Sequence, residues 1–281
     1  MPELPEVETV RKGLARLVTG KKIEAVQVLW GRIIEQPEKE MFELSLVGET
    51  ITGVDRRGKF LIVKLTNYDL ISHLRMEGKY EFHESKDDPL AKHTHVRFSF
   101  EDGSELRYLD VRKFGRMVLV DKDQSNQYKG ILALGPEPVP LDFTLGPFKE
   151  GLKRHHKAIK PLLLDQKLVT GLGNIYVDEA LWEAKIHPEQ PASSLTPREV
   201  KLLHAAIIDV LSRAVEAGGT TIRSYLNALG EAGKFQISLH AYGQTGEPCL
   251  RCGTPICKTK VAQRGTHFCP KCQKVRRRAS I

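Results

Sequence analysis

Three things are scarce in this sequence: long apolar runs, cysteine, and acidic residues near the C-terminus. No apolar run reaches about 18 residues and no hydrophobic leader is present, so we expect neither membrane insertion nor export. The five cysteines all lie between residues 249 and 272, which is too few and too clustered for a disulfide framework. We therefore expect a reducing, cytoplasmic location and a metal site.

Beyond Glu247 the chain carries nine Lys and Arg residues and no Asp or Glu, while the net charge of the whole chain is +8. The positive charge therefore belongs to the C-terminal module. Such a concentration favours a polyanionic partner, most often nucleic acid. A disordered solubilising tail is the alternative for Arg276–Arg278, but it does not account for the part that carries the cysteines.

The first half of the chain has the pattern of an antiparallel β-sandwich. Short runs of β-branched and aromatic residues predict strands over 22–30, 50–65, 70–82 and 95–120. Asp102-Gly103 is a strong hairpin signal within the last of these runs. Three prolines in the segment 135–140 cannot continue a helix or a strand, so we place the domain boundary there.

The second half is predicted to be helical. Thr196-Pro197 opens a long helix whose apolar residues keep a 3.6-residue period up to Gly218-Gly219. Two earlier helices, about Ile159–Leu164 and Val177–Ala184, flank the glycine-rich turn 171–176. A helix N-terminus after such a turn can bind an anion, which alone is a weak signal.

The predicted fold class is thus α+β with several domains. The expected organisation is a β-sandwich over 2–134 flanked by an N-terminal helix, a linker over 135–147, a helical domain over 148–235, a four-cysteine module over 236–274 and a basic tail over 275–281.

The N-terminal segment can carry reactive chemistry. Removal of Met1 would leave Pro2 as a free secondary amine, which attacks a carbonyl-level carbon to give an iminium ion directly. Glu3 is its neighbour. Pro5 suits the first turn of a helix, and Val7, Val10, Leu14 and Leu17 give this helix one apolar face. The alternative is a plain N-cap with solvated acids.

The cysteine spacing is the strongest local signal. Cys249 and Cys252 form one close pair, and Cys269 and Cys272 form the second. Four thiolates fill the tetrahedral sphere of one ion, so the site is structural and zinc is the default metal. Cys257 falls outside the spacing and is interpreted as a spare thiol.

Taken together, these motifs resemble bacterial formamidopyrimidine-DNA glycosylase. The resemblance rests on Pro-Glu-Leu-Pro-Glu-Val-Glu at the N-terminus, on Arg57-Gly-Lys-Phe60, on Gly171-Leu-Gly-Asn-Ile-Tyr176, and on the four-cysteine ribbon with Arg264. It covers residue 2 to about Gln273. It implies that the β-sandwich is the catalytic domain, that the helical domain is a helix–two-turn–helix DNA-binding domain, and that the four-cysteine module is a zinc finger. It implies a bifunctional glycosylase and AP lyase of base excision repair that removes 8-oxoguanine and formamidopyrimidines and cleaves the strand by β,δ-elimination.

The resemblance also implies roles for individual residues. Pro2 would be the nucleophile and Glu3 the general acid and base. Lys59 would assist base release and β-elimination. Arg264 would clamp the phosphates beside the lesion and assist δ-elimination. For Lys59 the alternative is a solvated turn lysine.

A stacked base cannot reach an N-terminal amine, so the nucleotide must leave the duplex and its place must be filled. Met76, Arg112 and Phe114 match the family's void-filling residues, although a core Met and Phe and a surface Arg are the alternatives. The expected phosphate contacts are His73, His93, His155, Lys157, Lys160 and Asn174. The loop expected to cover the flipped purine comprises Thr220, Thr221, Ile222, Arg223, Ser224 and Tyr225, with Gly218-Gly219 as its hinge.

Two rival functions stay open from sequence. An endonuclease VIII-like glycosylase for oxidised pyrimidines shares the Pro-Glu start, the lysine and the finger. A non-catalytic zinc-ribbon DNA-binding protein would need only the basic C-terminus. The expected cofactor is one structural Zn²⁺, and the expected partner is double-stranded DNA with oxidised purines. We expect a monomer in the cytoplasm, at the nucleoid.

Overall fold

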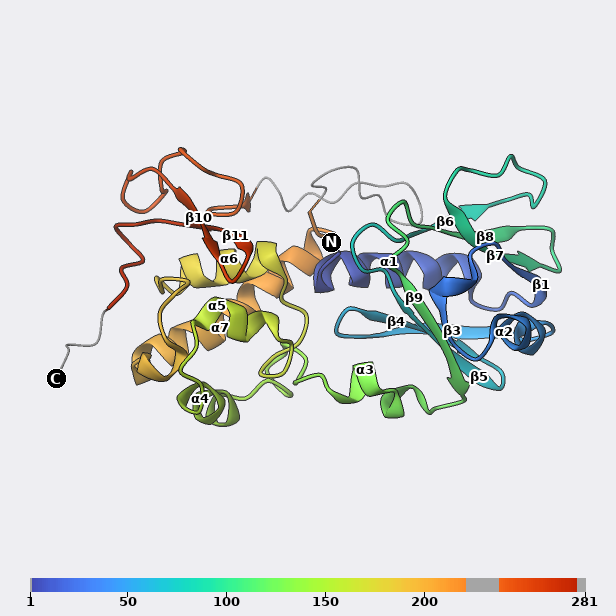
Figure 1. Ribbon diagram of the computed structural model, residues 1–281, viewed down its shortest axis with the longest axis horizontal. Helices are drawn as coiled ribbons and strands as arrows, with labels where there is room; N and C mark the ends of the chain where they lie inside the picture. Colours follow the sequence, from blue (N-terminus) through green and yellow to red (C-terminus); the bar gives the residue numbers. More distant parts are fainter. Residues whose placement is uncertain (1, 221–237, 277–281) are drawn as a thin grey trace. The chain divides into compact units, whose positions relative to one another are not determined.

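The computed structural model describes residues 2–220 and 238–276, which divide into two compact units (Figure 1). The first unit comprises residues 1–133 and a second segment that begins at Ala217; the other contains residues 134–216 and the C-terminal part of the chain. The sequence assigned this second segment to the helical domain. No described helix is long and apolar enough to span a bilayer.

Two sheets build most of the first unit, with the strand orders β1–β7–β8–β6 and β2–β9–β5–β4–β3. The strands are β1 (Ile23–Val28), β2 (Ile34–Gln36), β3 (Ile51–Arg57), β4 (Phe60–Leu65), β5 (Tyr68–His73), β6 (Lys79–His83), β7 (Thr94–Phe100), β8 (Glu105–Leu109) and β9 (Arg116–Asp121). Their pairing is antiparallel except for the parallel pair β2–β9. The sequence did not predict this exception, because no short hairpin links the two strands and fixes their relative direction.

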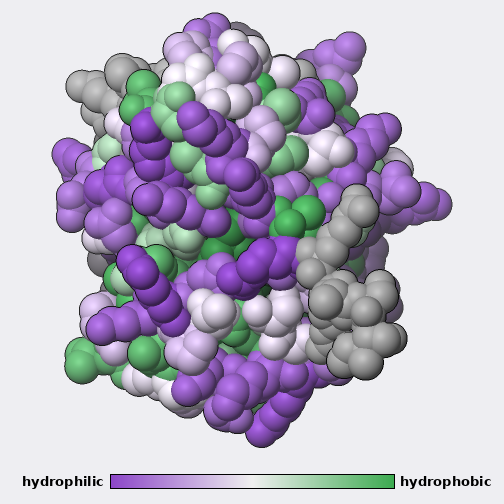
Figure 2. Space-filling model, turned by 90° about the vertical axis from the view of Figure 1, so that its left-hand side faces the viewer, coloured by the Kyte–Doolittle hydropathy of each residue, from purple (hydrophilic) through white to green (hydrophobic). Residues whose placement is uncertain are grey.

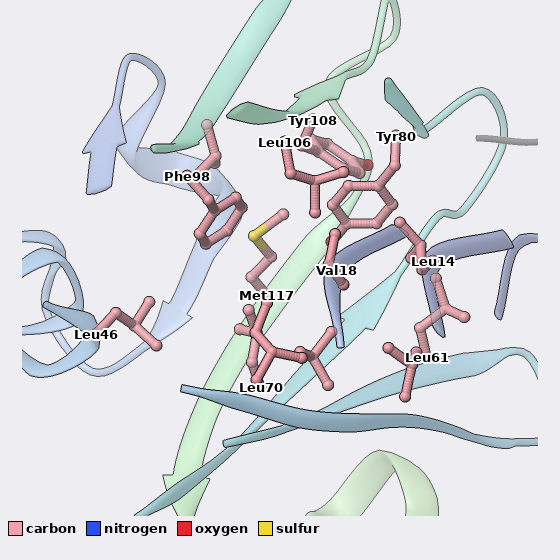
Figure 3. Close-up of a cluster of buried hydrophobic side chains, with 14 of the residues drawn as sticks. Leu14, Val18, Leu46, Leu61, Leu70, Tyr80, Phe98, Leu106, Tyr108 and Met117 are labelled. Atoms are coloured by element: carbon pink, nitrogen blue, oxygen red, sulfur yellow. The ribbon is translucent and has the colours of Figure 1, made fainter. Parts of the chain in front are cut away.

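Helix α1 (Leu4–Val18) supplies one wall of the core between these sheets. Its side chains Leu14 and Val18 point into the same cluster as Tyr80 and Tyr108 (Figure 3). Val7 and Val10 are also buried, as predicted, but Val18 rather than Leu17 completes the buried face. Burial of each such side chain contributes about 2 kcal/mol, so the helix that carries Pro2 and Glu3 is firmly anchored.

Shorter elements complete the first unit. These are η1 (Gly31–Ile33), α2 (Lys39–Leu46), η2 (Ser125–Gln127) and α3 (Lys129–Leu132). Helix α2 was missed from sequence because only Phe42 and Leu46 are buried, which is too few to give a 3.6-residue pattern.

The second unit is helical and carries the zinc-finger hairpin. Its elements are α4 (Leu145–Lys153), α5 (Ile159–Leu164), α6 (Asn174–Glu183), η3 (Ala192–Ser194), α7 (Pro197–Glu216), β10 (Cys257–Val261) and β11 (Arg264–Phe268). Helix α5 has the predicted bounds, and α7 begins at the predicted Thr196-Pro197. Its first turn is closed by Thr196 and Glu199, whose side chains each bind the other's backbone N–H.

Two helix starts in this unit differ from the prediction. Helix α4 begins inside the predicted linker, because Pro147 fits the first turn of a helix as well as it fits a linker. Helix α6 begins at Asn174, three residues before the predicted start. The surface seen in Figure 2 is covered largely by hydrophilic side chains, with smaller apolar areas between them.

Candidate active site and nucleic-acid interface

The start of α1 holds Pro2 and Glu3 in a buried setting. Glu3 is the N-cap, and its carboxylate accepts the backbone N–H of Glu6. In return, Oε2 of Glu6 accepts the backbone N–H of Glu3 over 2.9 Å. This reciprocal capping box satisfies two N–H groups that a helix leaves open and fixes the backbone next to Pro2.

The same Glu6 carboxylate binds the segment that follows α7. Its Oε1 accepts the backbone N–H of Thr220 over 2.8 Å and the Thr220 hydroxyl over 3.1 Å. Gly219 has a φ of +79°, and a Cβ at this position would lie 2.7 Å from Oε1 of Glu6. A glycine is therefore required at 219 by both conformation and space. Of the predicted loop, only Thr220 is described; residues 221–225 lie outside the described residues.

Lys59 lies in a two-residue hairpin turn. Arg57 and Phe60 pair across β3 and β4, which leaves Gly58 and Lys59 at the tip. Gly58 has a φ of +56°, which a glycine adopts without strain. Lys59 is 7% exposed, so it is not the solvated turn lysine of the alternative interpretation.

An ion-pair network ties this turn to α1. Arg56 donates to the Gly58 carbonyl over 2.8 Å and to the carboxylate of Glu8 over 3.0 Å, and Arg11 binds the same carboxylate. Burial alone raises the pKa of Glu8, but the two guanidinium groups outweigh it and hold this pKa below its usual value. The helix that begins beside the amine therefore also braces the Lys59 turn.

His73 is paired with Phe60 across β4 and β5, so it lies next to the Lys59 turn. Its ring packs edge-on against Phe60, with the centroids 4.6 Å apart. Burial, with the positive charges of Arg75 and Lys59, lowers the pKa of His73 to about 3. Nδ1 accepts the backbone N–H of Arg75 over 3.0 Å, so the proton of the neutral ring is on Nε2.

The predicted void-filling residues lie in two turns of the first unit. Met76 is half-buried in the turn after β5. Arg112 and Phe114 are exposed, and the guanidinium carbon lies 5.0 Å from the ring centroid. Phe114 is 47% exposed and therefore is not a core residue. His93 has a φ of 69°, and its carbonyl accepts the backbone N–H of Asp110 at the base of the second turn.

A surface pocket of about 430 Å³ lies elsewhere in this unit. Its lining includes Glu8, Arg11, Arg56, Arg57 and Lys64, but not Pro2, Glu3 or Lys59. Glu8 accepts hydrogen bonds from both Arg11 and Arg56, and Lys64 is paired with Asp69. The pocket is thus lined by the ion-pair network that supports the Lys59 turn and not by the predicted catalytic residues.

The four predicted metal ligands come together in the second unit. The Sγ atoms of Cys249, Cys252, Cys269 and Cys272 all lie within 4.8 Å of one another. Sulfur ligands of tetrahedral zinc are separated by roughly 3.8 Å, as follows from a Zn–S distance of about 2.3 Å. The four thiolates therefore fit one structural Zn²⁺ and leave no ligand position for water. Cys257 is exposed and outside this cluster, as expected for a spare thiol.

Arg264 lies at the tip of the zinc-finger hairpin. It pairs with Val261 across a two-residue turn, and it is exposed. Ala262 and Gln263 in this turn have φ values of 46° and 64°. Such a turn prefers Asn-Gly, so the backbone here is strained and must be held by its surroundings.

A buried network holds the strand that follows. The ammonium of Lys160 donates to Asp178 (2.7 Å), to the Gly265 carbonyl (3.1 Å) and to the Thr266 hydroxyl (2.8 Å). The other oxygen of Asp178 accepts the backbone N–H of His267 over 2.9 Å. Lys160 is fully buried, so its ammonium is directed at the hairpin and not at solvent, and a direct phosphate contact would require this network to open.

The other predicted contacts of this unit lie at its surface or against the hairpin. Lys157 is exposed and ion-paired with Asp165. His155 binds the Gly151 carbonyl through Nδ1 over 2.8 Å. Asn174, the first residue of α6, donates to the Gly265 carbonyl over 2.9 Å, while its Oδ1 is buried with no hydrogen-bond partner among the described residues.

Four acidic residues of the site were missed from sequence: Glu6, Asp110, Asp178 and Glu179. Glu179 accepts the backbone N–H groups of His240, Ala241 and Tyr242, and burial raises its pKa. Only Glu6 had a sequence signal, since Glu3-x-x-Glu6 has the spacing of a capping box. Asp178 and Glu179 bind backbone groups that are distant in sequence, which no local pattern reveals. Asp110 binds N–H groups two to five residues further along the chain.

Family models match three parts of the chain. Residues 1–117 match the formamidopyrimidine-DNA glycosylase N-terminal domain, residues 134–225 match the formamidopyrimidine-DNA glycosylase H2TH domain, and residues 246–275 match the zinc finger found in FPG and IleRS. The chain belongs to the formamidopyrimidine-DNA glycosylase family. It is therefore an enzyme, a DNA glycosylase with AP lyase activity, and the interpretation as a non-catalytic zinc-ribbon protein is wrong.

Relatives in this family are similar over nearly their whole length. The formamidopyrimidine-DNA glycosylase of Enterococcus faecalis is 73% identical over 278 residues, which is 99% of each chain. That of Latilactobacillus sakei is 58% identical, over 97% of this chain and 98% of the relative. A solved complex of Lactococcus lactis Fpg with DNA containing an abasic site has a TM-score of 0.93 at 48% identity and covers 97% of this chain and 100% of that one.

Proposed function

We propose that this chain excises oxidised purines, chiefly 8-oxoguanine and formamidopyrimidines, from double-stranded DNA and cleaves the strand by β,δ-elimination. The identity of 73% to a formamidopyrimidine-DNA glycosylase over 99% of both chains carries this conclusion. A complex of Lactococcus lactis Fpg with N7-benzyl-Fapy-dG DNA, at a TM-score of 0.92 and 49% identity, supports the substrate class. It also favours purines over the oxidised pyrimidines of the endonuclease VIII-like alternative.

In the proposed mechanism the amine of Pro2 attacks C1′ of the damaged nucleotide. The bond from C1′ to the base breaks, the base leaves with the electron pair, and it takes up the proton that the attacking amine releases. Glu3 then protonates the ring oxygen of the sugar as the ring opens, so the nitrogen of Pro2 and C1′ form an iminium ion. Loss of a proton from C2′ expels the 3′ phosphate, and a second elimination expels the 5′ phosphate. The buried capping box supports this role, because it fixes the backbone beside the amine.

Lys59 and Arg264 are proposed to assist these eliminations. The near-complete burial of Lys59 supports a function for its charge, since burial of an amine without a role is costly. Arg264 is exposed on a hairpin held by zinc and by Lys160, which suits a residue that clamps phosphates.

Met76, Arg112 and Phe114 are proposed to fill the gap left by the flipped nucleotide. The exposure of Phe114 beside the guanidinium of Arg112 supports this role, because an apolar wedge and a hydrogen-bond donor then stand together. The proposed contacts to phosphate are His73, His93, His155, Lys157 and Asn174. Residues 220–225 stay the proposed cover of the flipped base. We further propose that the enzyme acts as a monomer in the cytoplasm, at the nucleoid.

Borohydride trapping tests the mechanism. Duplex DNA with 8-oxoguanine opposite cytosine should give a covalent adduct that maps to Pro2. The adduct should disappear in Pro2→Gly and in protein that retains Met1, because neither presents the secondary amine. An adduct on Lys59 would overturn the choice of nucleophile. Preferential excision of an oxidised pyrimidine from a matched duplex would favour the endonuclease VIII-like alternative.

A further inference from the structure

The turn formed by residues 110–115, here called the insertion turn, is held from inside by one carboxylate. Asp110 is 1% exposed. Its Oδ1 accepts the backbone N–H of Arg112 over 3.0 Å, and its Oδ2 accepts those of Phe114 (2.9 Å) and Gly115 (2.8 Å). The backbone on both sides of the exposed side chains is therefore fixed by charge-assisted hydrogen bonds.

Asp110 is itself fixed by the neighbouring strand. Nε2 of His95 donates to the Asp110 carbonyl over 2.7 Å. The carbonyl of His95 in turn accepts the backbone N–H groups of Leu29 (2.8 Å) and Trp30 (3.4 Å). Trp30 follows β1. His95 binds both Trp30 and Asp110 and so fixes their relative position.

The insertion turn also reaches back to Trp30. Lys113 has a φ of 59°, and its ammonium lies 4.0 Å from the centroid of the Trp30 ring. A cation at this distance over an indole is attracted by the ring face. The backbone N–H of Lys113 donates to the Asp110 carbonyl over 3.2 Å. The contacts Trp30–His95–Asp110–Lys113–Trp30 therefore form a closed ring. The side chains of Arg112 and Phe114 are exposed and take no part in it.

We propose that Trp30 and Asp110 are positioning residues that order the insertion turn before DNA arrives. They contact no reacting atom; they hold Arg112 and Phe114 in the geometry needed to enter the duplex and to test the base opposite the lesion. Ordering in advance lowers the entropy lost on binding, so it improves the discrimination of the correct duplex. This inference rests on the proposed void-filling role of Arg112 and Phe114.

The variant Trp30→Leu tests the inference, since it keeps an apolar side chain but removes the ring face. The cation–π contact corresponds to about a three- to tenfold effect. We expect the preference for 8-oxoguanine opposite C over A to fall by about this factor and KM for the duplex to rise, with kcat within about twofold. Trp30→Phe should restore at least part of the preference, and Asp110→Asn should reduce it further.

Cleavage of an abasic site in single-stranded DNA provides the internal control, because it needs the amine but leaves no duplex gap to fill. This activity should stay within about twofold of wild type in Trp30→Leu. The matched control is Leu29→Ala, which truncates an exposed side chain outside the ring of contacts and keeps the backbone N–H bound to His95, so it should change neither activity. A parallel loss of both activities in Trp30→Leu would show a general folding role and overturn the inference.

Hydrogen exchange in the DNA-free protein separates this inference from the proposed function. The amides of Arg112, Phe114 and Gly115 should exchange about three- to tenfold faster in Trp30→Leu than in wild type. Unchanged exchange together with an unchanged preference for C would overturn the inference. If the wild-type enzyme itself shows no preference for the opposite base, the void-filling role fails, and the exchange rates alone then decide whether Trp30 orders the turn.

Discussion

The carboxylate of Glu6 links two backbone N–H groups that are more than 200 residues apart, those of Glu3 and Thr220, at 2.9 and 2.8 Å. Glu3 is next to the proposed nucleophile, and Thr220 is the first residue of the loop proposed to cover the flipped base. One side chain therefore holds both the start of α1 and the end of the glycine pair 218–219. Because one carboxylate binds both residues, a displacement of Thr220 should also displace the backbone at Glu3.

Glu6→Ala should therefore impair both stability and excision. A hydrogen bond to a charged group is worth about 1.5–3 kcal/mol, and this change removes several. We expect the free energy of unfolding to fall by at least about 3 kcal/mol and excision of 8-oxoguanine to fall at least tenfold. Thermal denaturation and single-turnover excision measure the two effects. The matched control is Glu40→Ala, which removes an exposed helical carboxylate and should change neither quantity. Full excision by Glu6→Ala would contradict the link.

Lys160 and Asp178 form a buried pair that also binds the hairpin next to Arg264. Loss of this pair should therefore change the position of Arg264. Breaking a buried ion pair by removing one partner costs about 3–5 kcal/mol, because the other charge stays buried and unpaired. Lys160→Met should therefore be strongly destabilising. The double variant Lys160→Met with Asp178→Leu should recover part of the stability, because it leaves no buried charge. Both variants should slow δ-elimination more than base release, which a gel assay resolves. Equal slowing of both steps would argue against a specific effect on the hairpin.

Zinc removal should affect the hairpin and spare the first unit. Cys252→Ser should lose the metal and at least about a hundredfold in DNA affinity, since the hairpin that presents Arg264 depends on the zinc for its fold. Cys257→Ser, which changes an exposed thiol outside the cluster, should retain about one zinc per chain, measured with a colorimetric chelator. Circular dichroism of the chelated protein should still show the β-sandwich. Tight DNA binding without zinc would remove the finger from the proposed interface.

The sequence predicted those parts of the site whose signals are local. The cysteine spacing gave the metal ligands, Thr196-Pro197 gave the start of α7, and the N-terminal prolines gave a helix that begins beside Pro2. Each signal depends on groups within a few residues of one another. Patterns of this kind survive in a sequence because helix caps and metal ligands have fixed spacing.

What sequence could not give is the long-range use of polar groups. Lys160 was expected at the DNA surface, because an isolated lysine in a basic segment is most often solvated. In the structure it is buried against Asp178 and the carbonyl of Gly265, more than 100 residues away. The parallel pairing of β2 and β9 was missed for the same reason, since it joins strands with no short connection.

His73 gives the last prediction. The pKa of His73 is about 3 in the folded protein, against an ordinary value of 6.5. Between pH 3 and pH 6.5 the imidazole is therefore protonated in the unfolded chain and neutral in the folded chain. Wild-type stability is then fully present above pH 6.5 and falls as the pH drops toward 3. Below pH 6 the wild type should lose about 1 kcal/mol more per pH unit than His73→Gln. The control is His156→Gln, at an exposed histidine, which should follow the wild-type curve.

The same neutrality decides what His73 contributes to DNA binding. A neutral imidazole donates one hydrogen bond through Nε2 but releases no counterion. His73→Gln should therefore weaken binding by about 1 kcal/mol or less while the slope of log K against log[salt] stays the same. Lys157→Ala should reduce that slope by about 1, since it removes a full positive charge at a proposed phosphate contact. Fluorescence anisotropy over a series of salt concentrations measures both slopes, and a shallower slope in His73→Gln would mean that the imidazole is charged when DNA binds.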